Sequence, residues 1–182
     1  MKEIELKIKV FGAPVLRKKA RPVKKVTPRE RDILSRMSRL MYDSAGIGLA
    51  APQAGFSECM IVADIGSGLY KLINPVVVKK EGRQKIEEGC LSVPGVCIKV
   101  ARAKKVRVEA IDENGRPQRI EAEGLFACVL QHEIDHLKGK LIVDYASVID
   151  KFRIKKQLRE LKKRAGNERV PEQKTKSCKL QL

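Results

Sequence analysis

Hydrophobic residues recur at helical spacing in three parts of the chain. The first part runs from about Pro28 to Ser44. It opens with Thr27-Pro28-Arg29-Glu30, which combines an N-cap, a proline at the first helical position and a glutamate that completes a capping box. Apolar residues then follow the spacing of one helical face: Ile33, Leu34, Met37, Leu40 and Met41. This pattern predicts an amphipathic helix.

Two further helices are predicted towards the C-terminus. From Gly124 to Leu137 one helical face carries both apolar and chemically reactive residues: Leu125, Cys128, Val129, His132 and His136. We expect this helix to be largely buried. The other helix opens with a second capping box at Ser147-Val148-Ile149-Asp150, and its apolar residues are Phe152, Leu158 and Leu161.

The middle of the chain, to about Glu123, has the pattern of strands. Short apolar runs at Met60–Ala63, Leu72–Val78 and Val106–Ile111 alternate with turn residues such as Asn114-Gly115. These signals predict strands that are mostly antiparallel. Together with the helices they indicate an α+β fold, in which the strands surround a central helix and are flanked by an N-terminal and a basic C-terminal helix.

Length and hydropathy indicate one domain that does not span a membrane. At 182 residues the chain can enclose a hydrophobic core, and we expect residues 1–164 to form the domain. Residues 165–182 are polar and rich in turn formers, which predicts a basic, mobile tail. The apolar runs have the length of strands, and the N-terminus resembles neither a signal nor a transit peptide. We therefore expect a cytoplasmic protein.

The charge is strongly positive. The sequence has 39 Lys and Arg residues against 22 Asp and Glu residues, a net charge of +17. Such a charge favours polyanions such as RNA or the ribosome, although it also serves solubility alone. Eight basic residues lie between Lys151 and Arg164, opposed in that span only by Glu160. This predicted helix is a candidate for ribosome docking, and the alternative is a solvated helix that packs its apolar residues on the core.

The segment His132-Glu133-Ile134-Asp135-His136 is an H-E-x-x-H pattern in the middle predicted helix. The four-residue spacing puts both imidazoles on one face, one turn apart, where they can bind one ion. Glu133 follows the first ligand and can accept a proton from a water at the open metal position. Because the chain has no other histidine, this arrangement favours a metal site over two unrelated polar residues.

A catalytic metal needs a third protein ligand, and spacing alone does not identify it. Asp144 is the nearest acid downstream, but its connection to the helix offers no special geometry. Cys128 shares the helical face but lies about 12 Å along the axis from His136. Cys90 is flanked by Gly and Pro residues, as expected of a bend that presents a ligand, and composition does not exclude Cys97. The five cysteines lack a C-x-x-C pair, so we expect reduced thiols and no disulfide framework.

Three segments resemble the signature motifs of peptide deformylases. They are Gly46-Ile47-Gly48-Leu49-Ala50-Ala51-Pro52-Gln53, Glu88-Gly89-Cys90-Leu91-Ser92 and Gln131-His132-Glu133-Ile134-Asp135-His136. The similarity covers about residues 5–150 and is closest to the compact bacterial type. After the middle helix the chain reads Leu141-Ile142-Val143-Asp144-Tyr145, which departs from the usual Phe and Asp-Arg of the family.

The resemblance implies an activity and a metal. The chain would be a metal-dependent hydrolase that removes the N-formyl group from the formyl-methionine of new polypeptides, by attack of a metal-bound hydroxide on the formyl carbon. The metal would be held by Cys90, His132 and His136. Fe(II) would be the native ion, and Zn(II) or Ni(II) could substitute. Glu133 would transfer the proton.

The resemblance also implies roles for residues around the metal. The side-chain amide of Gln53 and the backbone N–H of Leu91 would stabilise the negative charge that develops on the formyl oxygen. The residues assigned to the substrate side are Gly48, Ile47, Glu88, Leu125, Cys128 and Val129. Gly48 would let the peptide backbone approach, and Glu88 would form a buried ion pair with Arg102 that supports the site.

Two other classes of function remain open. A zincin-like peptidase would share H-E-x-x-H but would cut internal peptide bonds. An RNA- or ribosome-binding protein could use its His and Cys residues for structural zinc. Against the second reading, aromatic residues make up only 4% of the chain, and structural zinc sites normally have four protein ligands.

Overall fold

The computed structural model describes residues 6–166, and its first long helix is α1, Pro28–Asp43. The predicted capping box is present: the Thr27 hydroxyl accepts from the Arg29 N–H at 3.3 Å, and Glu30 accepts from the Thr27 N–H at 2.9 Å. The predicted apolar face of α1 is buried, with Leu34, Met37 and Met41 fully enclosed. The predicted helix is thus confirmed within one residue.

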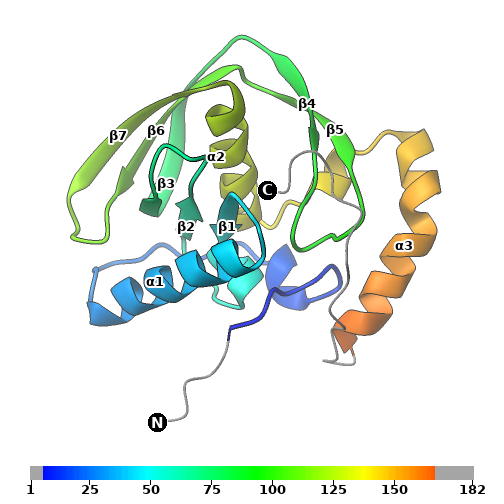
Figure 1. The fold of residues 1–182 in the computed structure, drawn as a ribbon, viewed down its shortest axis with the longest axis horizontal. Helices are drawn as coiled ribbons and strands as arrows, with labels where there is room; N and C mark the ends of the chain where they lie inside the picture. Colours follow the sequence, from blue (N-terminus) through cyan, green and yellow to red (C-terminus); the bar gives the residue numbers. More distant parts are fainter. Residues whose placement is uncertain (1–5, 167–182) are drawn as a thin grey trace.

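The central strands form two antiparallel sheets, as predicted (Figure 1). The larger sheet has the order β1-β2-β3-β6-β7, and the smaller consists of β4 and β5. The strands are β1 Gly48–Ala50, β2 Met60–Ala63, β3 Tyr70–Glu81, β4 Gln84–Glu88, β5 Ile98–Arg102, β6 Lys105–Ile111 and β7 Pro117–Glu123. Short 3-10 helices η1 (Pro14–Arg17), η2 (Ala51–Ala54) and η3 (Ile142–Tyr145) join the elements.

Helix α2, Gly124–Leu137, lies between the two sheets (Figure 1). Its bounds agree with the sequence prediction, and most of its residues are buried. Strand β2 explains how the larger sheet is covered on both faces. Ile61 and Ala63 pack in one core cluster with α2, whereas Met60 and Val62 pack in another with α1. The continuous apolar run of β2 therefore reflects burial on both faces.

Helix α3, Val148–Gly166, lies outside the smaller sheet (Figure 1). The Ser147 hydroxyl accepts from the Asp150 N–H at 3.1 Å and so caps the helix, as predicted. Ile154 and Leu161 pack in a core cluster with β5 and η3, and Leu158 lies against it.

The alternative in which all the apolar residues of this helix pack on the core does not hold for Phe152, because its side chain is 80% exposed. Phe152 precedes Ile154 by two residues, which places it about 200° around the helix from the buried stripe. The helix also continues to Gly166, two residues beyond the predicted end of the domain. The rest of the predicted tail, residues 167–182, lies outside the described residues.

The cysteines differ in part from expectation. Cys59, Cys90 and Cys128 are free thiols, as predicted. Cys97 is disulfide-bonded, so the expectation of reduced thiols is wrong at this position, and its sulfur is not available to a metal. Among residues 6–166 no helix has the length and apolar character needed to cross a membrane.

Candidate metal centre

His132 and His136 lie on successive turns of α2 and direct their imidazoles to one point. Their Nε2 atoms are 3.1 Å apart, and the rings meet edge to face with an interplanar angle of 77°. Both side chains are almost fully buried. The four-residue spacing therefore brings the two nitrogens together as the sequence predicts.

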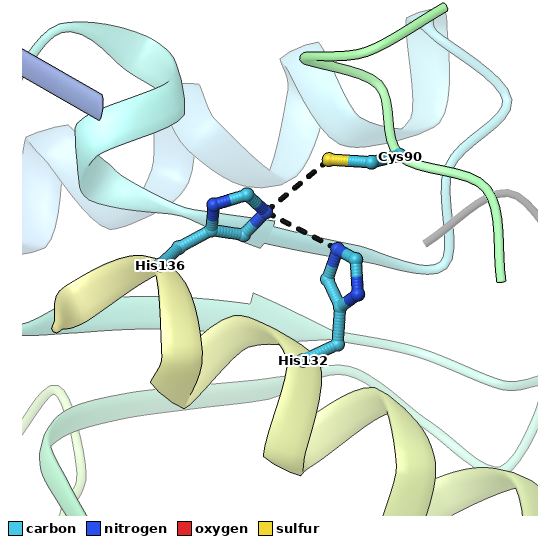
Figure 2. Close-up of side chains that lie close together, drawn as sticks. All are labelled: Cys90, His132 and His136. Carbon is cyan, nitrogen blue, oxygen red and sulfur yellow. Dashed lines mark hydrogen bonds between the residues drawn. The ribbon is translucent and has the colours of Figure 1, made fainter. Parts of the chain in front are cut away.

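Cys90 approaches the histidines from the loop after β4 (Figure 2). Its Sγ lies 3.3 Å from His136 Nε2, and the three ligand atoms are all within 4.8 Å of one another. The bend that presents the thiol is closed by a hydrogen bond of 2.9 Å from the Val93 N–H to the Cys90 carbonyl. No other group of three His, Cys, Asp or Glu side chains among residues 6–166 is placed to hold an ion.

The donor set fits a divalent transition metal. Bonds of about 2.0–2.1 Å to nitrogen and about 2.3 Å to sulfur imply ligand separations of roughly 3.3–3.6 Å in a tetrahedral site. The separations of 3.1 Å between the imidazole nitrogens and 3.3 Å from Cys90 Sγ to His136 are near this range, and all three atoms lie within 4.8 Å. Burial, and next the charge of Glu133, raise the pKa of the Cys90 thiol, and burial lowers the pKa of His136 well below its ordinary value. The Cys90 thiol therefore holds its proton and the His136 imidazole is neutral when no cation is bound, so binding an ion would release the thiol proton.

Glu133 is fully buried, and neither carboxylate oxygen has a hydrogen-bond partner among the described residues. Burial, and then the charge of Glu88, raise the pKa of Glu133 well above its ordinary value. Its carboxylate lies against Gly48, where a Cβ atom would be only 2.3 Å from Oε1. A buried, unpaired carboxylate of this kind is able to exchange protons with a bound molecule.

Gln53 and Leu91 are both neighbours of Cys90, Gln53 in space and Leu91 in the sequence. Gln53 is fully buried in η2, where Oε1 accepts from the Ala50 N–H at 2.8 Å and Nε2 points to Cys90 Sγ at 3.6 Å. Leu91 follows Cys90 in the chain, and its side chain packs in the core cluster of α1. The amide of Gln53 is thus held in one orientation beside the ligand sulfur.

The apolar residues assigned to the substrate are only partly brought together. Val129 is buried in the core cluster between α2 and the larger sheet, and the half-buried Ile47 and Leu125 pack against that cluster. Cys128 is fully buried, and its Sγ accepts from Gln84 Nε2 at 3.3 Å. Ile47, Leu125 and Val129 therefore share an apolar region, whereas the Cys128 sulfur contacts Gln84 of β4.

Glu88 lies behind His132. Its Oε2 is 3.0 Å from His132 Nδ1, and both carboxylate oxygens accept hydrogen bonds from the Arg102 guanidinium, at 2.7 and 2.9 Å. Although burial raises the pKa of Glu88, the hydrogen bonds from Arg102 and His132 outweigh it and lower that pKa. The ion pair with Arg102 is present as expected. Glu88 is fully buried, and its oxygens are engaged by His132 and Arg102.

Two residues of this network, Asp135 and Tyr145, were not predicted from the sequence. Asp135 accepts from Arg102 Nη1 at 2.6 Å, and Tyr145 donates to the same Asp135 oxygen at 2.6 Å. Asp135 could have been noticed because it lies inside the H-E-x-x-H segment. Nothing in the sequence links it to Tyr145. The other acid near the helix, Asp144, pairs with Arg17 at 2.6 Å and is not part of the centre.

Comparison with known proteins identifies the family. The sequence model of the polypeptide deformylase family matches residues 5–152. A peptide deformylase of Desulfitobacterium hafniense is 53% identical over 136 residues, which cover 75% of this chain and 91% of the relative. One of Halothermothrix orenii is 49% identical over 141 residues, or 76% of this chain and 92% of the relative.

Solved structures agree with the sequence relatives. The crystal structure of a peptide deformylase from Legionella pneumophila superposes with a TM-score of 0.83 at 41% identity, covering 91% of this chain and 99% of the other. A peptide deformylase from Synechococcus elongatus in complex with actinonin gives a TM-score of 0.77 at 38% identity, covering 91% and 88%. The chain belongs to the polypeptide deformylase family, metal-dependent hydrolases that remove N-formyl groups from nascent peptides.

Proposed function

We propose that the centre of Cys90, His132 and His136 binds one divalent metal ion and deformylates N-terminal formyl-methionine, with Glu133 as the proton-transfer group. The observation that supports this proposal most directly is the convergence of three buried donors, all within 4.8 Å, beside a buried carboxylate without a partner among the described residues. A divalent cation in such a site lowers the pKa of water and polarises a carbonyl oxygen.

In this proposal the side chains around the ion carry out the remaining steps. Glu133 accepts a proton from the attacking water and returns it to the leaving amine. Gln53 Nε2 and the Leu91 N–H donate hydrogen bonds to the formyl oxygen as its negative charge grows. The rigid placement of Gln53 by Ala50 supports this role, because a donor fixed in advance needs no reorganisation during the reaction.

Substrate binding is assigned to the apolar side of the centre. Ile47, Leu125 and Val129 would receive the methionine side chain, since they share one apolar region. Ile47 and Leu125 are partly exposed, whereas Val129 is buried. Cys128 would contribute at most the wall behind that region. The Gly48 backbone would face the peptide. We propose that Glu88 acts as a positioning residue that orients His132, because its oxygens are bound to Arg102 and His132.

Single substitutions separate the ligands from the proton-transfer group. Glu133→Gln keeps the shape of the side chain, so metal content should stay near wild type while kcat falls by at least about 10²-fold. Cys90→Ser should lose the metal, whereas the matched substitution Cys128→Ser should retain it. Activity is measured on a formyl-methionyl peptide and metal by elemental analysis. Wild-type turnover by metal-loaded Glu133→Gln would contradict the proposal.

An internally quenched peptide without a formyl group serves as the second substrate. We expect no cleavage of it, whereas a peptidase acting on internal bonds would cleave it. Retention of metal together with no turnover of either substrate would favour a structural ion instead.

We propose Fe(II) as the native ion. One thiolate and two imidazoles suit iron, zinc and nickel alike, so the donor set supports a transition metal without selecting one. A thiolate beside Fe(II) is open to oxidation of both the iron and the sulfur. Anaerobically prepared iron enzyme should therefore lose activity in air faster than the zinc or nickel form. Equal decay of the three forms would count against iron.

We also propose that α3 docks on the ribosome, where a cytoplasmic enzyme would meet new N-termini. Helix α3 packs through Ile154, Leu158 and Leu161, and most of its basic side chains are exposed. At its start Val148, Ile149 and Phe152 are 85%, 65% and 80% exposed. An apolar patch of this kind beside a basic face is a feature of interaction surfaces.

A further inference from the structure

Five side chains form a continuous network of contacts from the metal centre to the protein surface: His132, Glu88, Arg102, Asp135 and Tyr145. His132 Nδ1 lies 3.0 Å from Glu88, and Glu88 holds Arg102 through two hydrogen bonds of 2.7 and 2.9 Å. Arg102 Nη1 donates to Asp135 at 2.6 Å, and the Tyr145 hydroxyl donates to the same Asp135 oxygen at 2.6 Å. Nothing in the chain of contacts exceeds hydrogen-bond distance.

The inner members of this network are buried. The side chains of Glu88 and Arg102 are 0% and 5% exposed, so solvent has little access to replace a lost contact. A buried charge without its partner is strongly unfavourable, which ties the position of each group to the next. Arg102 needs Asp135 for its Nη1 group, since Glu88 occupies Nε and Nη2.

Tyr145 is the outermost residue of this network and contacts it in two ways. Its ring lies under the guanidinium of Arg102, with the charged carbon 5.0 Å from the ring centre, while its hydroxyl reaches past to Asp135. Burial, and next the hydrogen bond to Asp135, raise the pKa of Tyr145 to about 12, so the hydroxyl keeps its proton and remains a donor at neutral pH. Tyr145 ends η3, whose Ile142 and Val143 are buried in the core.

We infer that Asp135 and Tyr145 are positioning residues for the metal centre, which act on His132 through Arg102 and Glu88. A histidine ligand is oriented, and made a better donor, by the group that accepts from its other nitrogen. Asp135 and Tyr145 hold Arg102 in place, and Arg102 in turn holds Glu88, the group that contacts His132 Nδ1. The inference rests on the proposed binding of a metal by Cys90, His132 and His136.

The test measures how fast bound metal is lost. Zn(II)-loaded protein is mixed with an excess of a chromogenic chelator, and Co(II)-loaded protein is compared by its visible absorption spectrum. Tyr145→Phe removes the hydroxyl but keeps the ring on Arg102. We expect it to release zinc roughly 3- to 10-fold faster, below the roughly 10- to 100-fold typical of a partner that touches the ligand. Asp135→Asn should have a larger effect and should shift the Co(II) bands.

A second tyrosine of the protein provides a matched control for Tyr145→Phe. Tyr42, on the exposed side of α1, donates to Asp64 at 2.7 Å, the same type of hydrogen bond between residues outside the network. Tyr42→Phe should release zinc at the wild-type rate. If Tyr145 only stabilised the fold, its substitution would lower the melting temperature of the metal-free protein while leaving zinc release and the Co(II) spectrum unchanged.

The outcomes separate this inference from the proposed function. Zinc release by Tyr145→Phe at the wild-type rate would overturn the inference and leave the metal assignment intact. If wild-type protein failed to retain zinc, or if Cys90→Ser retained it equally well, the metal assignment itself would be wrong. The double variant Asp135→Asn/Tyr145→Phe should release zinc no faster than Asp135→Asn alone, because the two groups act through one contact.

Discussion

Gly48 lies where a side chain would collide with the carboxylate of Glu133. A Cβ atom at this position would be 2.3 Å from Oε1 and 2.9 Å from Cδ. Glu133 is fully buried, so its carboxylate has little room to move away from such a side chain. A glycine is therefore required at position 48 to leave room for the Glu133 carboxylate. This reason is additional to the close approach of a peptide backbone.

Gly48→Ala should lower kcat by roughly 10²-fold, because a misplacement of about 1 Å at a reacting group has effects of that size. Metal content should not change, since the new methyl group meets Glu133 and none of the three ligands. Steady-state kinetics with elemental analysis tests this. Gly46→Ala is the control: the nearest atom to its Cβ would be the terminal methyl of Leu91, at 2.8 Å, which can rotate away, and the Gly48 carbonyl oxygen lies at an ordinary 3.5 Å. Equal loss of activity in both variants would contradict the explanation.

Helix α1 illustrates how a local sequence signal becomes a contribution to stability. Glu30 is only 7% exposed and accepts from both the hydroxyl and the N–H of Thr27. The hydrogen bond from the Thr27 side chain, and next that from Arg29, lower the pKa of Glu30 to about 2, although burial opposes them. The ionised form is thus favoured in the folded protein over the unfolded chain.

The sign of the pH dependence follows from the lowered pKa. The contribution of Glu30 is fully present above its unfolded value of about 4.5 and is lost as the pH falls towards about 2. Glu30→Gln should therefore lower the free energy of unfolding by about 1 kcal/mol at pH 7, and by progressively less below pH ~4.5.

Chemical denaturation from pH 7 to pH 3 measures this difference. Asp32→Asn provides the control on the same helix, because Asp32 makes only an exposed ion pair with Arg36 at 3.6 Å. Its effect should stay below about 0.5 kcal/mol. A constant difference between wild type and Glu30→Gln over the whole pH range would show that ionised Glu30 contributes nothing.

The charge of the whole molecule bears on where it acts. With a net charge of +17 the protein is attracted to any polyanion, so binding to ribosomes by itself does not identify a docking surface. Binding through a local surface depends on the position of the charges, whereas general electrostatic attraction depends on their number. The exposed lysines of α3 allow this comparison.

Replacing Lys155, Lys156, Lys162 and Lys163 with Gln should weaken co-sedimentation with ribosomes and flatten its salt dependence, with turnover on a short formyl peptide unchanged. The control removes the same charge elsewhere and replaces the exposed residues Lys24, Lys25, Lys79 and Lys80. Binding that weakens equally in both variants would eliminate docking through α3 and leave only the net charge.

The bounds of two helices and the meeting of the two histidines can be predicted from local sequence. The bounds of α1 and α2 agree with prediction because caps and a 3.6-residue apolar period are written within each segment. The meeting of His132 and His136 follows from one helical turn. Glu133 beside them follows in the same way, and motif resemblance selected Cys90 from among the candidate thiols.

Contacts between distant segments could not be predicted from spacing. Cys90 reaches the histidines only because the loop after β4 packs across α2, and Tyr145 joins Asp135 only because η3 turns back beneath Arg102. The exposure of Phe152 depends on which stripe of α3 meets the smaller sheet. A local pattern fixes which residues share a face of one element, whereas the packing of elements decides what that face meets, and therefore which buried charges become partners.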